Sequence, residues 1–315
     1  MKSKWHILIL LTASIFNLLK PTSALAIDLD TELSTWMRYV NDGAILSDLT
    51  IPGTHDSGAM HESVAGTAKT QNLTIGEQLN IGVRYLDIRL RHYGDAFVVH
   101  HGSVYQHLNF DDVLTQVTAF LAENPSEVVI MEVSEEYTAE NTTRTFEETF
   151  VTYTDNSAYS SYWWRHSYVP AVGDVRGKIV LLRRFSGSFR RAGGIDVRPW
   201  QDNDQFTLYD TRGVAISVQD FYQINLHTND NKWEAILDRL SAAQADGSGT
   251  LFLNFTSGYR SILGIPNIPS VSGDINERLV KYFQGVTASN VHHGIVISDF
   301  ISEEMVKEQL RPFFY

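Results

Sequence analysis

Cysteine is absent from the 315 residues of this chain. Its absence excludes a disulfide framework, a thiol nucleophile and any metal site built from cysteine. The hydrophobic core must therefore suffice to stabilise the fold, and 315 residues are enough for one large domain. Basic residues are also scarce, with 25 Lys and Arg against 37 Asp and Glu, and the formal net charge is -12. A chain this acidic is a poor candidate for binding nucleic acids, and bulk charge would not hold it on an anionic membrane.

Long apolar segments are missing after the N-terminus, so the sequence predicts no membrane-spanning helix in the main part of the chain. The N-terminus itself has two lysines, an apolar run at residues 7–19 and the small-residue pattern Ala24-Leu25-Ala26. These features predict a secretory signal peptide at residues 1–26, and hence a secreted protein whose domain spans residues 27–315. A membrane anchor is the alternative, but an apolar run of about 13 residues is short for a bilayer span.

Short apolar runs recur along the chain, and most are rich in Val, Ile and Leu without regular polar alternation. This composition is typical of strands that are buried on both faces, as they are in parallel sheets. The runs with this character are residues 48–51, 83–90, 97–100, 128–133, 179–184, 214–220, 250–255 and 294–299.

Apolar residues at helical spacing lie between several of these runs. They predict helices over residues 33–40, 113–121 and 233–240, with Asp30 as the N-cap of the first helix and Asn229 or Asp230 at the start of the third. The alternation of strands and helices predicts an α/β fold, an irregular (β/α)8 TIM barrel in a single domain. The irregularity is expected at residues 93–95, because this Tyr-Gly-Asp link is too short to contain a crossover helix.

Polar side chains stand at the ends of most predicted strands, where TIM barrels carry their active sites. The two-residue period of a strand places Asp87 and Arg89 on one face. Convergence of such residues favours an active site, whereas ion pairs that merely close the barrel rim are the structural alternative. The residues at these ends are His55 and Asp56, Asp87 and Arg89, His100 and His101, Glu132 and Ser134, Arg183 and Arg184, Asp220 and Tyr222, and Asp299.

Histidines, carboxylates and an arginine together form a set of groups suited to phosphodiester cleavage. An imidazole titrates near neutral pH, so two of them can act as general base and general acid. A carboxylate behind a histidine fixes its tautomer, and an arginine can hold a phosphate by two parallel hydrogen bonds. Such a site can promote attack of a neighbouring hydroxyl on phosphorus, and the scheme requires no metal.

Histidine pairs at 100–101 and 292–293 raise the alternative of a metal site. Adjacent residues of a strand point to opposite faces, so each pair can supply only one ligand to a common ion. The sequence also lacks an HExxH motif and an Asp-rich calcium loop, and we therefore expect no metal and no other cofactor. Further histidines are interpreted as structural or loop residues, namely His61, His92, His107, His166 and His227.

A series of short motifs extends over most of the chain. They are IPGTHDS at 51–57, YLDIR at 85–89, HHG at 100–102, NPSE at 124–127, RGKIVLL at 176–182, Arg184, VQD at 218–220 with Tyr222, and Asp299. In this order and spacing, the chain from about residue 46 to residue 300 resembles the bacterial-type phosphatidylinositol-specific phospholipases C. The resemblance implies an irregular TIM barrel that cleaves phosphatidylinositol to diacylglycerol and inositol 1,2-cyclic phosphate.

The same resemblance implies which residues perform the proton transfers. His55 would be the general base that takes the proton of the inositol 2-hydroxyl, and Asp299 would orient it. His101 would be the general acid that protonates the diacylglycerol oxygen, assisted by Asp56.

The resemblance also implies how the substrate is held. Arg89 would bind the phosphate, with Asp87 beside it. Related enzymes place calcium at this position, so an arginine there implies metal independence. Arg184, Asp220 and Tyr222 would hold the inositol ring.

Two departures from the family pattern concern contacts with the substrate and the membrane. Residues 132–136 contain no lysine, which leaves the head-group preference open. The region after Gly58 lacks the tryptophan that helps such enzymes enter membranes. The apolar loop at 259–268 is a candidate substitute for membrane contact, and packing of this loop on the barrel is the alternative.

Two other functions are compatible with a barrel of this kind. A metal-dependent glycerophosphodiester phosphodiesterase would need carboxylate ligands where Arg89 stands. An inositol-phosphate-binding module without activity is the second alternative, and the presence of both His55 and His101 argues against it. The expected partner is phosphatidylinositol in membranes, contacted transiently by a monomer that binds no nucleic acid.

Overall fold

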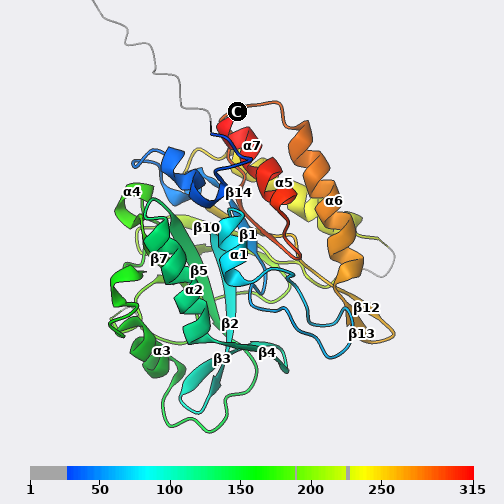
Figure 1. Ribbon diagram of the computed structural model, residues 1–315. Helices are drawn as coiled ribbons and strands as arrows, with labels where there is room; N and C mark the ends of the chain where they lie inside the picture. Colours follow the sequence, from blue (N-terminus) through cyan, green and yellow to red (C-terminus); the bar gives the residue numbers. More distant parts are fainter. Residues whose placement is uncertain (1–26, 189, 225–227) are drawn as a thin grey trace, which may run out of the picture.

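A mostly parallel β-sheet runs through the centre of the protein, and helices cover its outer side (Figure 1). The structure is a computed structural model that describes residues 27–188, 190–224 and 228–315. The predicted signal peptide and His227 lie outside the described residues. Apolar side chains of the strands and of the covering helices form one continuous core. Among the helices in the described ranges, none has both the length and the apolarity that a membrane span requires.

The main strands follow one another in the order β6-β7-β5-β2-β1-β14-β11-β10-β9. All neighbours in this order pair in parallel except β9, which is antiparallel to β10. Within the described residues no pairing joins β9 to β6, so the barrel is open there. The irregular single-domain TIM barrel predicted from the sequence is confirmed. The strands are β1 (Thr50–Thr54), β2 (Tyr85–Tyr93), β5 (Val128–Glu135), β6 (Trp163–Trp164), β7 (Lys178–Arg184), β9 (Gln205–Tyr209), β10 (Ala215–Gln219), β11 (Leu251–Phe255) and β14 (Gly294–Ser298).

The barrel is irregular at residues 93–95, as predicted, and this link joins β2 to an antiparallel ribbon. The ribbon consists of β3 (Ala96–His101) and β4 (Val104–Asn109), and β3 pairs antiparallel with β2. Leu90 lies opposite Val99 in this pairing, so the end of β3 returns to the level of Arg89. The hairpin thereby delivers His101 to the same end of the barrel as β2 delivers its charged residues.

Helices pack on the outside of the sheet, and two of the three helix predictions are confirmed. Residues 113–121 lie within α2, and residues 233–240 lie within α5, which has Asn229 as its N-cap. The α-helices are α1 (Ile75–Asn80), α2 (Phe110–Glu123), α3 (Phe146–Thr154), α4 (Val172–Val175), α5 (Asp230–Ala245), α6 (Pro269–Gly285) and α7 (Glu303–Phe314). Shorter elements are η2 (Leu46–Asp48), η3 (Ser160–Tyr162), β8 (Ile195–Asp196), which pairs with β7, and the separate hairpin of β12 (Arg260–Ile262) and β13 (Ile265–Asn267).

The prediction of an α-helix over residues 33–40 capped by Asp30 is wrong. The segment forms the 3-10 element η1 (Leu33–Tyr39), which is kinked at Thr35 and preceded by Glu32 as its N-cap. The buried guanidinium of Arg84 donates to the carbonyl oxygens of Leu33 and Ser34, which would accept the first hydrogen bonds of a regular helix. A tertiary contact therefore overrides the apolar spacing. The carboxylate of Asp30 instead pairs with Lys307 on α7.

The first strand begins and ends later than predicted, and this shift matters for the site. Residues 46–48 form η2, and β1 continues through Pro52 and Gly53 to Thr54. A Cβ atom on Gly53 would lie 3.0 Å from the Cβ of Tyr85, so glycine permits the close packing of β1 on β2. Thr54 pairs with Ser298 of β14 and with Leu86 of β2. His55 consequently emerges next to the residues that follow Ser298 and Leu86.

Candidate active site

A cavity of about 400 Å³ opens at the carboxyl ends of the barrel strands. The two predicted site residues that do not line it, Asp56 and Asp87, are fully buried and lie against Arg89. The structure thus brings the nine predicted residues together around one space. The predicted residues that line the cavity are His55, Arg89, His101, Arg184, Asp220, Tyr222 and Asp299.

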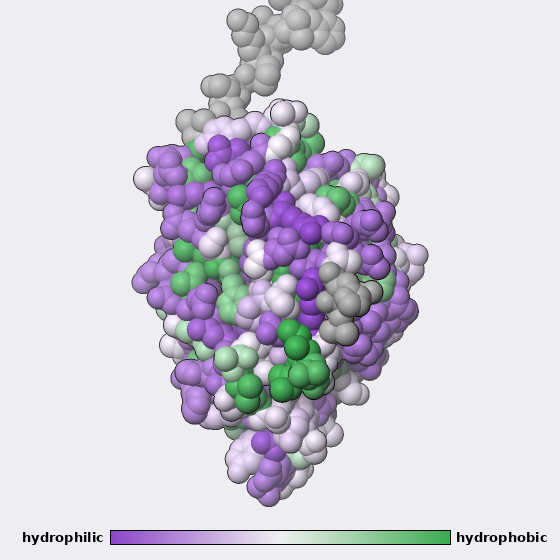
Figure 2. Space-filling model, turned by 90° about the vertical axis from the view of Figure 1, so that its right-hand side faces the viewer, coloured by the Kyte–Doolittle hydropathy of each residue, from purple (hydrophilic) through white to green (hydrophobic). Residues whose placement is uncertain are grey.

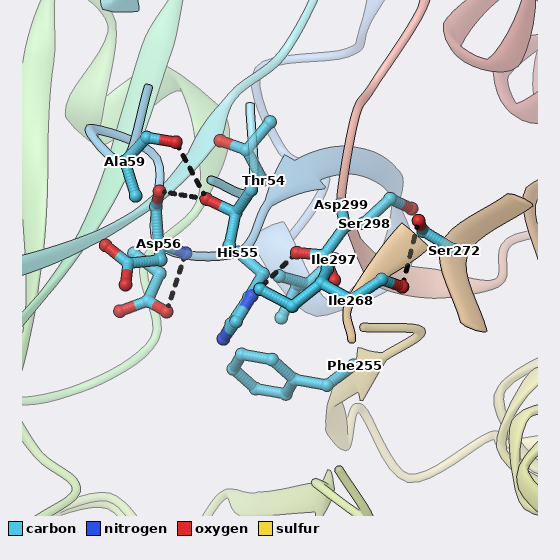
Figure 3. A network of polar contacts seen from close by, with 12 residues as sticks. Thr54, His55, Asp56, Ala59, Phe255, Ile268, Ser272, Ile297, Ser298 and Asp299 are labelled. Atoms are coloured by element: carbon cyan, nitrogen blue, oxygen red, sulfur yellow. Dashed lines mark hydrogen bonds and ion pairs between the residues drawn. The ribbon is translucent and has the colours of Figure 1, made fainter. Parts of the chain in front are cut away.

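His55 is held between a carboxylate and a guanidinium. Its Nδ1 lies 2.7 Å from Oδ1 of Asp299 (Figure 3). Its Nε2 lies 2.8 Å from Nη2 of Arg89. Because Nη2 of Arg89 can only donate, Nε2 is the acceptor and the proton of the neutral ring is on Nδ1. The ring of Phe255 contacts the imidazole edge-on, with centroids 6.2 Å apart. His55 is therefore fixed in a tautomer whose basic nitrogen faces the cavity.

Arg89 is anchored by the two buried carboxylates. Its Nε and Nη2 lie 3.2 and 3.0 Å from Oδ2 of Asp87, and Asp56 lies 3.9 Å away. Burial opposes ionisation of Asp87, but Arg89, His55 and the backbone N–H of Asp56 together lower the pKa of Asp87 to about 2. The arginine is thus oriented from behind by an ionised carboxylate.

His101 stands across the cavity from His55, with ring centroids 6.5 Å apart and planes nearly perpendicular. Its Nδ1 lies 2.7 Å from the carbonyl oxygen of Ala68 and 3.4 Å from Oδ2 of Asp56. The closer partner is the backbone carbonyl, so Nδ1 donates to Ala68. Burial, followed by the charge of Arg89, lowers the pKa of His101. The sequence offers no signal for the contact with Ala68, because any residue supplies a carbonyl group.

Asp56 has an unusual environment. Its carboxylate is fully buried, and neither oxygen accepts a hydrogen bond from any described residue. Burial raises the pKa of Asp56 well above its ordinary value, although Arg89 opposes this. Its backbone adopts a positive φ of 38°, a conformation that turns the chain sharply after His55.

His100 points away from the cavity, in contrast to its neighbour. Its ring stacks on Tyr137 with centroids 6.0 Å apart, and its Nδ1 contacts the carbonyl oxygen of Gly102. The choice of His101 over His100 as a cavity residue agrees with this arrangement. The backbone N–H of Gly102 donates to Glu136, another residue of the cavity wall.

The remaining wall of the cavity contains a second polar cluster. Arg184 lies over the ring of Trp200 at 4.1 Å, and Nε1 of Trp200 donates to Oδ2 of Asp220 at 2.9 Å. The hydroxyl of Tyr222 donates to Oδ1 of Asp202 at 2.6 Å. Burial and this contact with Asp202 raise the pKa of Tyr222 to about 12. Sequence reasoning missed Trp200 and Asp202, although both lie in a segment rich in polar and aromatic residues.

The segment without a lysine, residues 132–136, supplies a buried carboxylate instead. Nη1 of Arg184 lies 3.2 Å from Oε1 of Glu132, and Tyr85 donates to the other oxygen. Burial and the nearby charge of Asp87 raise the pKa of Glu132 to about 7. Arg184 therefore has a counter-charge below it that titrates near neutrality.

Within residues 27–188, 190–224 and 228–315, no three His, Asp or Glu side chains are grouped so that they could hold a metal ion. The pair at 292–293 precedes β14, as expected from the sequence. His293 is fully buried, with its ring nitrogens facing Thr50 and Gln244.

The β12–β13 hairpin forms part of the rim of the cavity. Pro266 and Ile268 at its base line the cavity, whereas Ile262, Leu263 and Ile265 are 49%, 98% and 53% exposed. Figure 2 shows an apolar patch, in green, on the face of the molecule that carries this hairpin. The tip of the loop at 259–268 is therefore not packed on the barrel, which was the alternative expectation.

Comparisons with known proteins point to one family. Residues 44–185 match the family described as phosphatidylinositol-specific phospholipase C, X domain. A 1-phosphatidylinositol phosphodiesterase of Staphylococcus aureus is 34% identical over 234 residues, which cover 70% of this chain and 74% of the relative. A Listeria monocytogenes protein of the same name is 27% identical over 301 residues, covering 88% and 84%.

Solved structures show the same relationship in three dimensions. A variant of the phosphatidylinositol-specific phospholipase C of Staphylococcus aureus superposes with a TM-score of 0.81 at 27% identity. The superposition covers 90% of this chain and 98% of the solved chain. From the motif order, the barrel and these similarities, we conclude that the chain belongs to the phosphatidylinositol-specific phospholipase C X-domain family.

Proposed function

We propose that this protein is a phospholipase C that cleaves phosphatidylinositol to diacylglycerol and inositol 1,2-cyclic phosphate without a metal. One observation carries the proposal. The basic Nε2 of His55 lies 2.8 Å from Arg89, the group suited to hold a phosphate, while Asp299 holds the opposite ring nitrogen. A base and an anion-binding group in direct contact suit attack of a hydroxyl on a bound phosphodiester.

In the proposed reaction, the phosphate of the lipid takes over the N–H groups that Arg89 donates to His55. Nε2 of His55 is then free to accept the proton of the inositol 2-hydroxyl. The hydroxyl oxygen bonds to phosphorus, and the bond from phosphorus to the diacylglycerol oxygen breaks. His101 gives its Nε2 proton to that oxygen, so the two histidines exchange protonation states over one turnover.

The environment of His101 supports its part in this scheme. The carbonyl oxygen of Ala68 accepts from Nδ1, which leaves Nε2 on the cavity side of the ring. Burial and then the charge of Arg89 lower the pKa of His101, and both disfavour the imidazolium in the free protein. An anionic phosphodiester on Arg89 offsets that repulsion, so the acid gains its proton when the substrate binds. Asp56, 3.4 Å from Nδ1, stabilises the imidazolium when its carboxyl group is ionised.

The second cluster of the cavity suits an inositol ring. Arg184 and Asp220 offer a donor and an acceptor to ring hydroxyls, and Tyr222 offers an aromatic face for the apolar side of the ring. Because Glu132 offsets the charge of Arg184, this end of the cavity is expected to favour an uncharged ring over one that carries further phosphates.

Contact with the membrane is proposed to occur through the exposed tip of the β12–β13 hairpin. Ile262, Leu263 and Ile265 form an apolar surface on the rim of the cavity, where insertion would bring the opening to the lipid head groups. The net charge of -12 favours neutral or zwitterionic surfaces over strongly anionic ones. Secretion through the signal peptide at residues 1–26 and a monomeric state belong to the same proposal.

Phosphorus NMR of phosphatidylinositol vesicles incubated with purified protein and EDTA tests the proposal. We expect the lipid phosphorus signal to be replaced by that of a five-membered cyclic phosphate. Cleavage that stops in EDTA would refute metal independence. An intact lipid signal, with or without added divalent cations, would refute the function.

A further inference from the structure

Lys232, in the first turn of α5, is a buried cation with no part in the scheme above. Its side chain is 2% exposed, and lysine is rarely buried unless it is paired. Its position adds a second cost, because the N-terminus of a helix carries partial positive charge. Burial and the helix N-terminus both destabilise a charged group here. We therefore expect the ammonium group to make contacts that the protein requires.

Nζ of Lys232 joins the ends of two neighbouring barrel strands. It donates to Oε1 of Gln219 at 3.1 Å and to the carbonyl oxygen of Phe255. These are the last residues of β10 and β11. The side-chain amide of Gln219 also donates to the carbonyl oxygen of Phe255 and to Asn254. Lys232, Gln219 and Phe255 therefore all contact one another.

The two residues that Lys232 contacts, Phe255 and Gln219, each lie next to a residue of the cavity wall. The ring of Phe255 packs against His55, as Figure 3 shows. Gln219 immediately precedes Asp220, which faces the opposite half. Burial lowers the pKa of Lys232 to about 7, whereas the carboxylates of Asp220 and Asp299 favour its charged form.

We propose that Lys232 is a positioning residue whose ammonium group, by holding the ends of β10 and β11 together, sets His55 in place relative to Asp220. This inference deepens the proposed function and rests on it, since it takes His55 as the base and Asp220 as a head-group contact. Misplacement of reacting groups by about 1 Å can reduce a rate by ~10²-fold. The clamp therefore acts on the chemical step, without touching the substrate.

The first test compares Lys232→Met with Lys281→Met. Methionine is unbranched and only one atom shorter than lysine, but it has no donors, and the control lysine is exposed on α6. We expect kcat on a soluble inositol phosphodiester to fall by on the order of 10²-fold in Lys232→Met, with little change in KM. The control should keep the wild-type kcat. A folded Lys232→Met variant with unchanged kcat would overturn the inference.

The second test uses the absence of cysteine, because Lys232→Cys introduces a unique thiol. Alkylation in denaturant with 2-bromoethylamine, followed by refolding, recreates a side chain of lysine length that ends in an ammonium group. Alkylation with 1-bromopropane gives the same length with a terminal methyl group. We expect the first product to recover kcat and the second to remain slow. Equal activity of the two would mean that Lys232 only fills space, and this pair decides the question if Lys232→Met does not fold.

A third readout does not depend on turnover. The ring 15N signals of His55, recorded with labelled histidine, should move in Lys232→Met and stay in place in Lys281→Met. Wild-type protein that leaves phosphatidylinositol intact would refute the proposed function, whatever these signals do. Wild-type cleavage combined with an unmoved His55 signal in Lys232→Met would refute the clamp alone.

Discussion

Replacing Asp299 by asparagine changes one atom and should reverse the hydrogen bonding of His55. The carboxylate of Asp299 can only accept, which places the imidazole proton on Nδ1. An asparagine amide can donate to Nδ1 instead, which moves the ring proton to Nε2. That proton would point at Nη2 of Arg89, 2.8 Å away, where two donors would then face each other.

The expected loss follows from these two contacts. In the reversed tautomer Nε2 has no lone pair for the 2-hydroxyl proton, so the general base is lost along with its orientation. Loss of the correct tautomer behind a catalytic histidine costs ~10⁴-fold in kcat. At about 1.36 kcal/mol for each factor of ten, this equals ~5 kcal/mol of transition-state stabilisation. KM should change little, because Asp299 is expected to act on the base and not on the bound lipid.

Asp202→Asn is a matched control, because it makes the same one-atom change in the same cavity at the partner of Tyr222. Initial rates on a soluble inositol phosphodiester, with thermal unfolding of each variant, measure the effect. We expect kcat to fall by ~10⁴-fold in Asp299→Asn and by far less in the control. Similar losses in the two variants would refute the tautomer argument. In a His55→Ala background, Asp299→Asn should cause no further loss, since the residue it orients is gone.

Three further predictions concern other parts of the molecule. His55→Ala and His101→Ala should each reduce kcat by ~10²–10⁴-fold without loss of the folded circular dichroism spectrum, and near-normal turnover in either would exclude the histidine pair as acid and base. The double variant Ile262→Ser, Leu263→Ser should cleave soluble substrate normally and vesicles slowly, whereas equal loss on both substrates would indicate damage to the fold. Burial, and to a lesser extent His292, lowers the pKa of His293 to about 4. As the pH falls, His293 therefore gains its proton in the unfolded chain before it does so in the folded protein. The free energy of unfolding loses ~3 kcal/mol that is present above about pH 6.5, and the loss is complete once the pH has fallen through 4. Urea unfolding at several pH values should show a weaker pH dependence in His293→Gln, and an unchanged dependence would contradict the assignment.

The sequence predicts the parts of the fold that depend on local pattern. Buried parallel strands have apolar runs without alternation, and α5 has its N-cap at Asn229, so these elements could be recognised. The carboxyl ends of parallel strands meet at one face, which is why polar residues at the strand ends could be grouped without knowing any distance. The resemblance to a known family then selected nine of these residues as the site. The irregularity after β2 followed from chain length alone, since three residues cannot contain a crossover helix.

Contacts between distant segments account for what the sequence did not predict. The 3-10 form of η1 depends on the guanidinium of Arg84, which lies about fifty residues further along the chain. The carbonyl oxygen that orients His101 belongs to Ala68, and a backbone group has no signature in a sequence. Trp200 belongs to the site because its indole contacts both Arg184 and Asp220. The sequence does not show that these three residues lie close together.

The pairing of β1 with β14 has a consequence for when the protein can act. His55 and Asp299 are 244 positions apart, and their contact requires the first and last strands of the barrel to lie side by side. Contacts between such distant positions form late in folding, since the chain must first close a very large loop. A chain that has been made only in part therefore contains His55 but lacks the carboxylate that orients it. Under the proposed mechanism, activity therefore requires that the chain has been made as far as Asp299 and that β14 has paired with β1.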